Sequence, residues 1–418
     1  MSAKLIAVEG DTVRIELNDK PCKALVIAPQ PFFSPRGTPY SVYYRTLVAS
    51  ELCVKIDLLT YGEGEDVDIP GVRIFRIPCF CRLGNVKTGP SALKLLLDSF
   101  ILLWAIALLV RNRYSFVHAH EESVFFCRFL KPIFRFKLIY DMHSSLPEQL
   151  TNFTFTKSKA LIWLFKKLEE SSLHAADAVV TICPALADYV RGIIDNAEKH
   201  LVIENSIFDT IKLARSTPQG VSSRDNADPE RIQSSLPEGK RFVVYAGTLE
   251  PYQGIGLLIE AFPQVVQSQP DAFLLIVGGT PEQVKHYYNL ARAKGIHDNC
   301  LFTGRVSQSI AHYYTSIATV LVSPRSAGTN TPLKIYQQLA SGIPLVATRI
   351  HSHTQVLDDS VAFLIDPEPG DMARGISEAL SMEVERLRRA TNARDLYEKK
   401  YSRQAYVAKM RQLLEIVK

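Results

Sequence analysis

The sequence lacks the features that mark a zinc-binding, redox-active or secreted protein. Its seven cysteines are scattered over 418 residues, and no two of them have the C-x-x-C spacing of a metal or redox site. The first residues, Met1 to Asn18, are charged and polar, so we expect no signal peptide. Free thiols in a reducing compartment are therefore the expected state of the cysteines, and the expected location is the cytoplasm.

An excess of charge of one sign is also missing. Lysine and arginine number 48 against 43 aspartates and glutamates, which leaves a net charge of +5. This balance gives no reason to expect a nucleic-acid partner, but it is compatible with an anionic substrate or a membrane surface. Asp66 and Asp68 lie in an acidic, turn-rich segment, where a solvated loop is expected rather than a metal site.

No predicted strand is followed by G-x-G-x-x-G, which disfavours a dehydrogenase. One segment, Leu93 to Val110, is apolar almost throughout. Its uninterrupted part, Ser99 to Val110, is shorter than the roughly 20 residues of a membrane-spanning helix. A buried helix of a domain is the favoured interpretation, and shallow insertion at a membrane interface is the alternative.

Two series of alternating strands and helices make up most of the chain. Because 418 residues are many for one domain, we expect two doubly wound α/β domains. The first spans residues 1–208 and starts with a hairpin over 1–20. A polar linker covers 209–240, the second domain covers 241–395, and residues 396–418 are helical.

The second domain contains the most informative stretch. An apolar strand, Val320 to Val322, leads into a polar loop and then a helix whose first residue is expected to be Pro332, with Thr331 as its N-cap. Free N–H groups at such a helix start attract anions, and Lys334 adds a positive charge there. An ordinary βαβ connection without a ligand remains the alternative, and geometry alone favours it.

Polar residues also gather at strand ends in the first domain. His118 and His120 end one predicted strand, next to Glu121, and Asp141 and His143 end the following one. Because the carboxyl ends of parallel strands border the ligand crevice of open sheets, a substrate site is expected there. Histidines satisfied by local hydrogen bonds are an equally weighted alternative.

These motifs resemble glycosyltransferase family 4, a group of retaining enzymes that use nucleotide sugars. The resemblance covers nearly the whole chain from Ala24 and implies the GT-B fold. In this fold two Rossmann-like domains face a central cleft, and a C-terminal helix, here residues 396–418, packs back on the first domain. The motifs that carry it are the Gly37 loop, Val117 to His120, Val202 to Asn205, Ala246 to Glu250, Leu301 to Arg305 and Pro332 to Ala347.

The sequence departs from the family pattern at the donor site. Two glutamates that usually stand eight positions apart are replaced by Thr329 and Gln337. The basic residues that usually follow the first strand of the second domain are also absent, near Thr248 and Gln253. Positive charge for a diphosphate would then come from Lys334, Arg305 or Arg325, together with the helix N-terminus.

The resemblance assigns roles residue by residue. Lys334 is expected on the diphosphate, Gln337 on the ribose, Arg305 near the base and His120 on the sugar. No protein base, metal or cofactor is implied, because the leaving phosphate takes the acceptor proton in this family. The full set of expected site residues is: catalytic His120, Lys334 and Arg305; donor-binding Gly37, Thr38, Gly247, Thr248, Gly304, Arg325, Thr329, Asn330, Thr331, Leu333 and Gln337; acceptor-binding His118, Glu121, Asp141 and His143.

The function expected from the resemblance is transfer of a sugar from a UDP- or GDP-linked donor to an acceptor. Lipid-linked and envelope-polysaccharide acceptors are both left open, with peripheral contact at the inner face of the membrane. A non-catalytic, transferase-like binding or scaffold protein is the rival interpretation, motivated by Thr329, Gln337, Thr248 and Gln253. A nucleotide-sugar epimerase of the same fold is disfavoured because the motifs follow the transferases.

Overall fold

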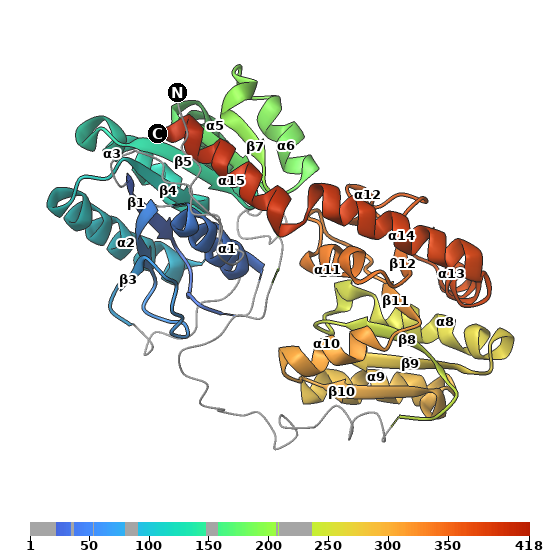
Figure 1. Cartoon of the computed structure of the whole chain (residues 1–418). Helices are drawn as coiled ribbons and strands as arrows, with labels where there is room; N and C mark the ends of the chain where they lie inside the picture. The colour runs from blue at the N-terminus through green and yellow to red at the C-terminus, as the bar shows by residue number, and fades with distance from the viewer. Residues whose placement is uncertain are drawn as a thin grey trace.

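The computed structural model describes residues 22–34, 37–52, 54–79, 91–147, 158–205, 208 and 236–418. Two α/β domains, each built on a parallel sheet, follow one another along the chain (Figure 1). The predicted two-domain GT-B architecture is confirmed. The predicted N-terminal hairpin and almost all of the polar linker lie outside the described residues.

The first domain contains a seven-stranded parallel sheet with the order β3-β2-β1-β4-β5-β6-β7. Long crossovers connect the strands because parallel neighbours need them. The bounds are β1 Cys22–Ala28, β2 Val54–Thr60, β3 Val72–Arg76, β4 Phe116–His120, β5 Lys137–Met142, β6 Ala178–Thr181 and β7 His200–Val202.

Helices cover both faces of this sheet. Leu25 and Ile27 of β1 point into one core, and Ala24, Val26 and Ala28 point into the other, as the two-residue period of a strand requires. The first core contains α2 (Ala92–Arg111), α3 (Val124–Phe134), α5 (Lys159–Ala175) and α6 (Pro184–Arg191), and the second contains α1 (Gly37–Glu51) and α15 (Arg403–Val417).

The second domain has a six-stranded parallel sheet with the order β10-β9-β8-β11-β12-β13. Its strands are β8 Arg241–Ala246, β9 Ala272–Val277, β10 Cys300–Gly304, β11 Val320–Ser323, β12 Leu345–Thr348 and β13 Phe363–Ile365. One core holds α8 (Ile255–Ser268), α9 (Pro281–Ala293) and α13 (Pro369–Ser381). The other holds α10 (Gln308–Ser316), α11 (Leu333–Ser341) and α14 (Glu383–Lys400).

The C-terminal helix returns to the first domain, as expected. The residue range 396–418 begins inside α14, and α15 starts after the N-cap Ser402. Figure 1 shows α15 lying along the first domain while α14 stays with the second. Tyr406, Met410 and Leu413 are buried in the core that α1 shares, so the chain crosses between the domains twice.

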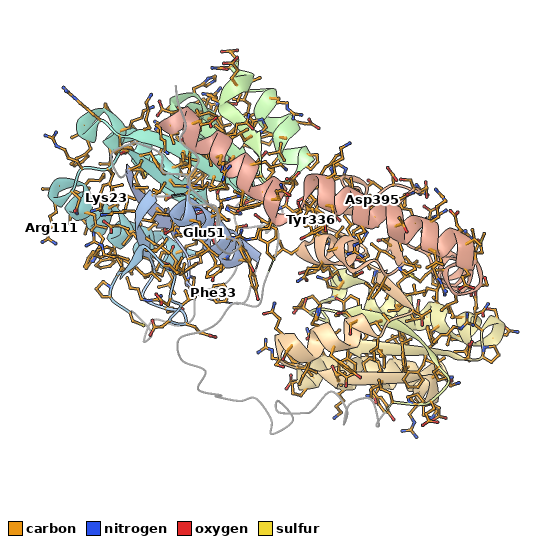
Figure 2. All side chains as sticks on the ribbon, in the orientation of Figure 1. Lys23, Phe33, Glu51, Arg111, Tyr336 and Asp395 are labelled. Atoms are coloured by element: carbon orange, nitrogen blue, oxygen red, sulfur yellow. The ribbon has the colours of Figure 1, made fainter. Side chains whose placement is uncertain are left out.

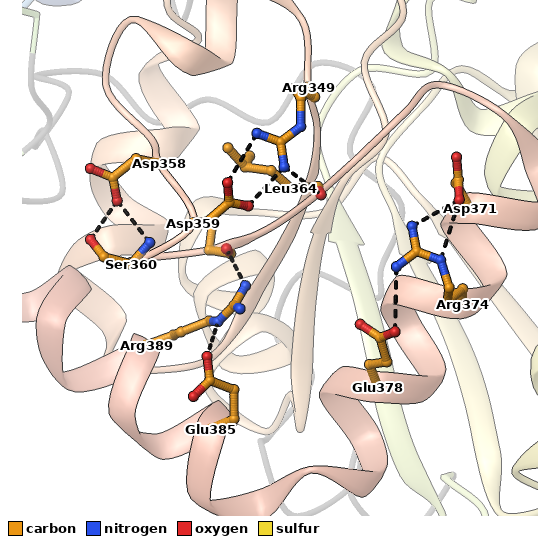
Figure 3. Close-up of polar contacts among 11 residues, drawn as sticks. Arg349, Asp358, Asp359, Ser360, Leu364, Asp371, Arg374, Glu378, Glu385 and Arg389 are labelled. Carbon is orange, nitrogen blue, oxygen red and sulfur yellow. Dashed lines mark hydrogen bonds and ion pairs between the residues drawn. The ribbon is translucent and has the colours of Figure 1, made fainter.

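Ion pairs are formed within the segments that follow β12 in the second domain. Arg349 pairs with Asp359 at 2.8 Å, and Arg374 bridges Asp371 and Glu378 (Figure 3). These side chains are largely exposed, where an ion pair contributes about 0–1 kcal/mol. Every charge named here has a partner, so we assign this cluster a structural role rather than a binding role.

Three local expectations are wrong. Gly37 is the first residue of α1 rather than part of a loop. Pro332, not Thr331, is the N-cap of α11, and no side chain caps that helix, because the extended backbone of Pro332 precedes the first helical residue, Leu333. Cys79 is disulfide-bonded, so the expectation of free thiols fails at that position.

Candidate functional site

A buried polar cluster lies where β4 and β5 end. His118 and His120 are two residues apart on β4, so their rings point to the same face and stack with centroids 4.6 Å apart. Asp141 of β5 pairs with His120 across the sheet, and His143 follows that strand. All four side chains are buried. The structure therefore brings together four residues that the sequence places at the substrate site.

The carboxylate of Asp141 is at the centre of this cluster. Its Oδ2 lies 3.0 Å from Nε2 of His118, and its Oδ1 lies 3.3 Å from Nε2 of His143. Nδ1 of His120 lies 3.1 Å from Nε2 of His143. Sequence reasoning missed Arg45 of α1, which is 1% exposed and forms an ion pair with Asp141. An arginine among the apolar residues of an amphipathic helix is the signal that could have indicated it.

The charge state of the cluster follows from these contacts. Burial by itself raises the pKa of Asp141, but Arg45 and the neighbouring histidines outweigh it and hold that pKa well below its usual value. Burial lowers the pKa of His120 far below its ordinary value and that of His143 to about 4. At neutral pH the cluster thus combines one ion pair with the neutral imidazoles of His120 and His143, and a neutral imidazole both donates and accepts hydrogen bonds.

Two ring nitrogens of the cluster have unused hydrogen-bonding capacity. Within the described part of the chain, Nε2 of His120 and Nδ1 of His143 are buried and have no hydrogen-bond partner. Buried polar atoms are normally paired, so these two are suited to receive groups of a bound molecule. They are the atoms through which this site would hold a hydroxyl.

Three residues of the same cluster have the spacing of metal ligands. One ligand atom from each of His118, His120 and Asp141 lies within 4.8 Å of the others. However, the guanidinium of Arg45 already contacts Asp141 and neutralises its charge. A cation placed there would meet an arginine instead of a free carboxylate, so the donor set fits a metal ion poorly.

The second cluster lies at the carboxyl end of the second sheet. Nζ of Lys334, in the first turn of α11, lies 4.2 Å from the ring centroid of Tyr245 and donates to Oε1 of Gln253 at 3.2 Å. The guanidinium of Arg325 lies 5.3 Å from the ring centroid of Tyr252. Burial, with a smaller contribution from Arg325, lowers the pKa of Lys334 to about 7. A nearby anion would stabilise the protonated form of a buried lysine such as Lys334.

Close main-chain contacts fix the loops that carry these cations. Gly254 has a φ of +74°, and a Cβ there would lie 1.8 Å from the carbonyl oxygen of Pro324. The loop after β8 therefore packs directly on the loop after β11, which only glycine permits. Thr348 donates to the carbonyl of Arg325 at 2.5 Å, and Nδ1 of the buried His353 lies 2.8 Å from the carbonyl oxygen of Thr348.

The other expected donor residues surround this cluster less closely. Thr329 and Gln337, at the positions of the usual glutamates, are exposed. Arg305 is also exposed, directly after β10, and within the described ranges no hydrogen bond or ion pair joins it to Lys334 or His120. Thr248 contributes its carbonyl oxygen, which accepts from the hydroxyl of Tyr245 at 2.6 Å. The remaining expected residues Gly37, Thr38, Gly247, Gly304, Thr331 and Leu333 lie at exposed or half-buried positions.

Glu121 differs from the other expected acceptor residues. It has a φ of +51°, and its carboxylate lies 3.9 Å from Nζ of Lys94 on α2, not in the histidine cluster. Burial raises its pKa to about 7, against the effect of Lys94. The structure thus places Glu121 beside α2 rather than beside Asp141.

Polar contacts join the two clusters across the domains. Nδ2 of Asn330 donates to the carbonyl of His143 at 3.0 Å. Gln355, which sequence reasoning did not single out, accepts from the N–H of Ala185 at 2.9 Å and donates to the carbonyl of Thr329 at 2.6 Å. The loop before α11 therefore contacts both the histidine cluster and the start of α6.

Two protein-family models match this chain, one over each domain. A domain model described as "Glycosyl transferase 4-like domain" matches residues 43–206, and one described as "Glycosyl transferases group 1" matches residues 226–396. The chain belongs to the family 4 glycosyltransferases. The two models cover the two domains that carry the histidine and lysine clusters.

Curated relatives match over part of the chain. It is 28% identical over 157 residues to the phosphatidyl-myo-inositol mannosyltransferase of Mycobacterium tuberculosis, covering 37% of this chain and 40% of the relative. It is 27% identical over 188 residues to the lipopolysaccharide 1,2-N-acetylglucosaminetransferase of Salmonella typhimurium, covering 43% of this chain and 49% of the relative. The chain thus spans less than half the length of these relatives.

Solved structures match over nearly the whole chain. Sucrose-phosphate synthase from Thermosynechococcus elongatus superposes with a TM-score of 0.69 at 18% identity, covering 94% of this chain and 98% of that one. HepE of Anabaena in complex with UDP gives a TM-score of 0.66 at 16% identity, with the same coverage. At this identity the likeness shows the fold.

Proposed function

We propose that this protein is a retaining glycosyltransferase that moves a sugar from a UDP- or GDP-linked donor to a lipid-linked or envelope-polysaccharide acceptor. One observation carries the proposal. The loop that leads to Lys334 donates, through Asn330, to the carbonyl of His143. A cation suited to a diphosphate and neutral histidines suited to a sugar therefore belong to adjoining parts of the two domains.

The second domain would hold the donor. Lys334 and Arg325 would contact the diphosphate, since in the described part of the chain neither has a carboxylate partner. The N–H groups at the start of α11, which no side chain caps, would add to this attraction. Gln337 would contact the ribose, and Gly304 with Arg305 would flank the base.

The first domain would orient the transferred sugar. Nε2 of His120 and Nδ1 of His143 would bond its hydroxyls, and Asp141 would hold the imidazoles in place through the contacts described above. We assign no protein base, because the leaving phosphate is expected to take the acceptor proton. Catalysis would rest on positioning and on charge stabilisation at the diphosphate, without a metal ion.

The acceptor is proposed from the relatives and from composition. Two relatives are named for acceptors with lipid parts, phosphatidyl-myo-inositol and lipopolysaccharide. Among the described residues one helix, Leu93–Arg111, is long and apolar enough to cross a membrane. That helix connects β3 to β4 and buries Ile101 in the core, so it belongs to the folded domain. A peripheral enzyme at the inner membrane face fits these features.

A nucleotide screen tests the proposal. Purified protein should be stabilised against heat by UDP or GDP, or by their sugars, with or without EDTA, because a ligand that binds only the folded state raises apparent stability. Lys334→Ala should lose that stabilisation and most of the turnover, whereas Lys285→Ala, an exposed lysine on α9, should keep both. If no nucleotide at millimolar concentration shifts the melting temperature, the exposed Thr329 and Gln337 would instead favour a non-catalytic binding or scaffold protein.

A further inference from the structure

Helix α2 is apolar on its outer face as well as on its inner face. Its inner side chains, including Ile101 and Ala105, are fully buried in the first-domain core. Its outer stripe runs through Leu96, Leu103 and Val110, which are seven residues apart, with Leu103 59% and Val110 71% exposed. Only 28% of the most apolar stretch of this helix, which lies within Leu93–Arg111, is buried. The fold therefore uses one face of α2 and leaves a second apolar face without a cover in the described structure.

The neighbouring helices extend this face. Helix α3 packs against both α2 and α5, and the rings of Phe125 and Phe165 meet between α3 and α5 at 6.4 Å. On α3, Phe129 and Ile133 are exposed one turn apart, and on α5 Trp163 is 61% exposed. The exposed large apolar side chains of the described first domain all lie on these three helices: Leu95, Leu96, Leu103, Val110, Phe129, Ile133, Trp163 and Leu164.

The unmatched charges on this face are positive. Asp98 of α2 accepts from the hydroxyl of Tyr61, Glu169 of α5 accepts from Ser145 at 2.9 Å, and Glu170 pairs with Lys167 at 2.8 Å. By contrast, six cations on or next to the three helices form no ion pair within the described ranges: Arg111, Arg113, Arg128, Arg135, Lys159 and Lys166.

Aromatic and basic groups are interleaved on the same surface. The guanidinium of Arg128 lies 4.2 Å from the ring centroid of Phe129. Trp163 stands one turn after Lys159 and less than one turn before Lys166 on α5. Arg111 extends from the outer end of α2 (Figure 2). Tryptophan and basic side chains beside an exposed apolar stripe are the composition of surfaces that lie in a membrane interface.

From this juxtaposition we propose that the outer face of α2, α3 and α5, here called the α2–α3–α5 face, docks on an anionic lipid bilayer. The inference rests on the proposed lipid-linked acceptor and names the surface that would bring the enzyme to it. Apolar side chains of the face enter the interface, and the unmatched cations meet the lipid phosphates. A second copy of the chain is a poorer occupant, because a two-fold contact would set these like charges against each other.

Co-sedimentation with vesicles tests the proposal on the full chain. The wild-type protein should bind mixed phosphatidylcholine and phosphatidylglycerol vesicles, bind pure phosphatidylcholine vesicles much more weakly, and lose binding as salt is raised. Leu103→Glu combined with Trp163→Glu should weaken binding to the mixed vesicles by about tenfold or more. Lys159→Glu combined with Lys166→Glu should do the same, because each basic residue near an anionic surface contributes about fivefold.

Matched variants separate this face from the general surface. Val384→Glu with Leu387→Glu changes two exposed apolar residues of α14, and Lys285→Glu with Lys399→Glu changes two exposed lysines of the second domain. Both pairs should bind vesicles like the wild type. The proposal is overturned if the wild type does not bind anionic vesicles, if the α2–α3–α5 variants bind as well as it does, or if the wild type is a dimer that those variants dissociate.

A nucleotide thermal shift on the same preparations keeps this inference separate from the proposed function. All these residues are exposed, so every variant should fold and should retain the wild-type response to UDP or GDP. Vesicle binding without any nucleotide response would support the face and overturn the proposed function. A nucleotide response without vesicle binding would support the proposed function and overturn the α2–α3–α5 face as a membrane-docking surface.

Discussion

Asn330 of the second domain donates its side-chain N–H to the main-chain carbonyl of His143 in the first domain at 3.0 Å. Asn330→Asp keeps the size of the side chain but removes the donor. We expect kcat/KM to fall by about fivefold to tenfold, because a lost hydrogen bond costs about 1 kcal/mol and leaves a carbonyl unpaired. Steady-state kinetics would check this, with Asn392→Asp as the control. Asn392 makes the same bond to the carbonyl of Ser360 at 3.0 Å within the second domain, so its loss should leave kcat/KM unchanged.

Arg45 should be essential for stability. Arg45→Met would leave the carboxylate of Asp141 buried without its cation, which typically costs about 3–5 kcal/mol of unfolding free energy. Arg403→Met removes a partly exposed ion pair with Glu51 and should cost less than about 1 kcal/mol. Urea denaturation would compare the two. If Arg45→Met does not fold, Arg45→Lys should fold with intermediate stability; equal costs for Arg45 and Arg403 would contradict the argument.

The stability contributed by His143 and His353 should be lost as the pH drops from about 6.5 toward 5. Burial lowers the pKa of His143 and of His353 to about 4, so the unfolded chain takes up protons in this range that the folded chain does not. Each such histidine contributes up to about 1.4 kcal/mol per pH unit. Asp141 adds no slope there, because its lowered pKa keeps it ionised in both states above about pH 5. Unfolding free energies measured in urea at several pH values should show a smaller slope for His353→Gln than for the wild type.

Nucleotide binding should weaken as the pH rises from about 7 to 9, because Lys334 loses its proton with a pKa of about 7. The terminal phosphate, with a pKa of about 6, is already ionised over this range. The dissociation constant of UDP or GDP should rise up to about tenfold per pH unit in the limit where only the protonated lysine binds. Lys334→Arg should abolish this dependence and still bind, since arginine stays charged. An identical pH profile in Lys334→Arg would remove Lys334 from the diphosphate site.

Gly254 should be intolerant of a side chain. Gly254→Ala places a Cβ 1.8 Å from the carbonyl oxygen of Pro324 at a positive φ, so the loops that carry Gln253 and Arg325 would separate. We expect nucleotide affinity to fall by about tenfold or more and the melting temperature to decrease. Gly256→Ala, two residues later in α8, has nothing within 4 Å of the new Cβ and should be neutral or stabilising. Isothermal titration calorimetry would measure the nucleotide affinity of both variants, and thermal melts would measure their melting temperatures. Equal effects of the two substitutions would contradict the argument.

Strand and helix order could be predicted from the sequence because its apolar strands and amphipathic helices are regular. The strand ends also predicted that His118, His120, Asp141 and His143 would meet, since parallel strands end at one edge of a sheet. Arg45 and Gln355 could not be predicted in this way. Arg45 reaches Asp141 from α1, a helix far away in sequence that packs on the face of the sheet to which Asp141 points, and Gln355 contacts α6 across the domains. Both contacts depend on tertiary geometry rather than on local pattern.

The cap of α11 and the position of Glu121 show that backbone conformation also limits prediction from the sequence. Thr331 has the chemistry of an N-cap, but the extended backbone of Pro332 moves the helix start by one residue. Glu121 follows His120 directly, yet its positive φ turns it toward Lys94. A single backbone dihedral redirected the side chain, and residue type alone does not reveal it.

The return of α15 to the first domain also sets an order of assembly during synthesis. Tyr406, Met410 and Leu413 complete one face of the first sheet, and they leave the ribosome after every residue of the second domain. The domain that is made first is therefore completed last, while the second domain already has all its strands and its covering helices. A chain truncated near Tyr401 and released from the ribosome would hold a complete second domain and a first domain with one face open to chaperones and proteases.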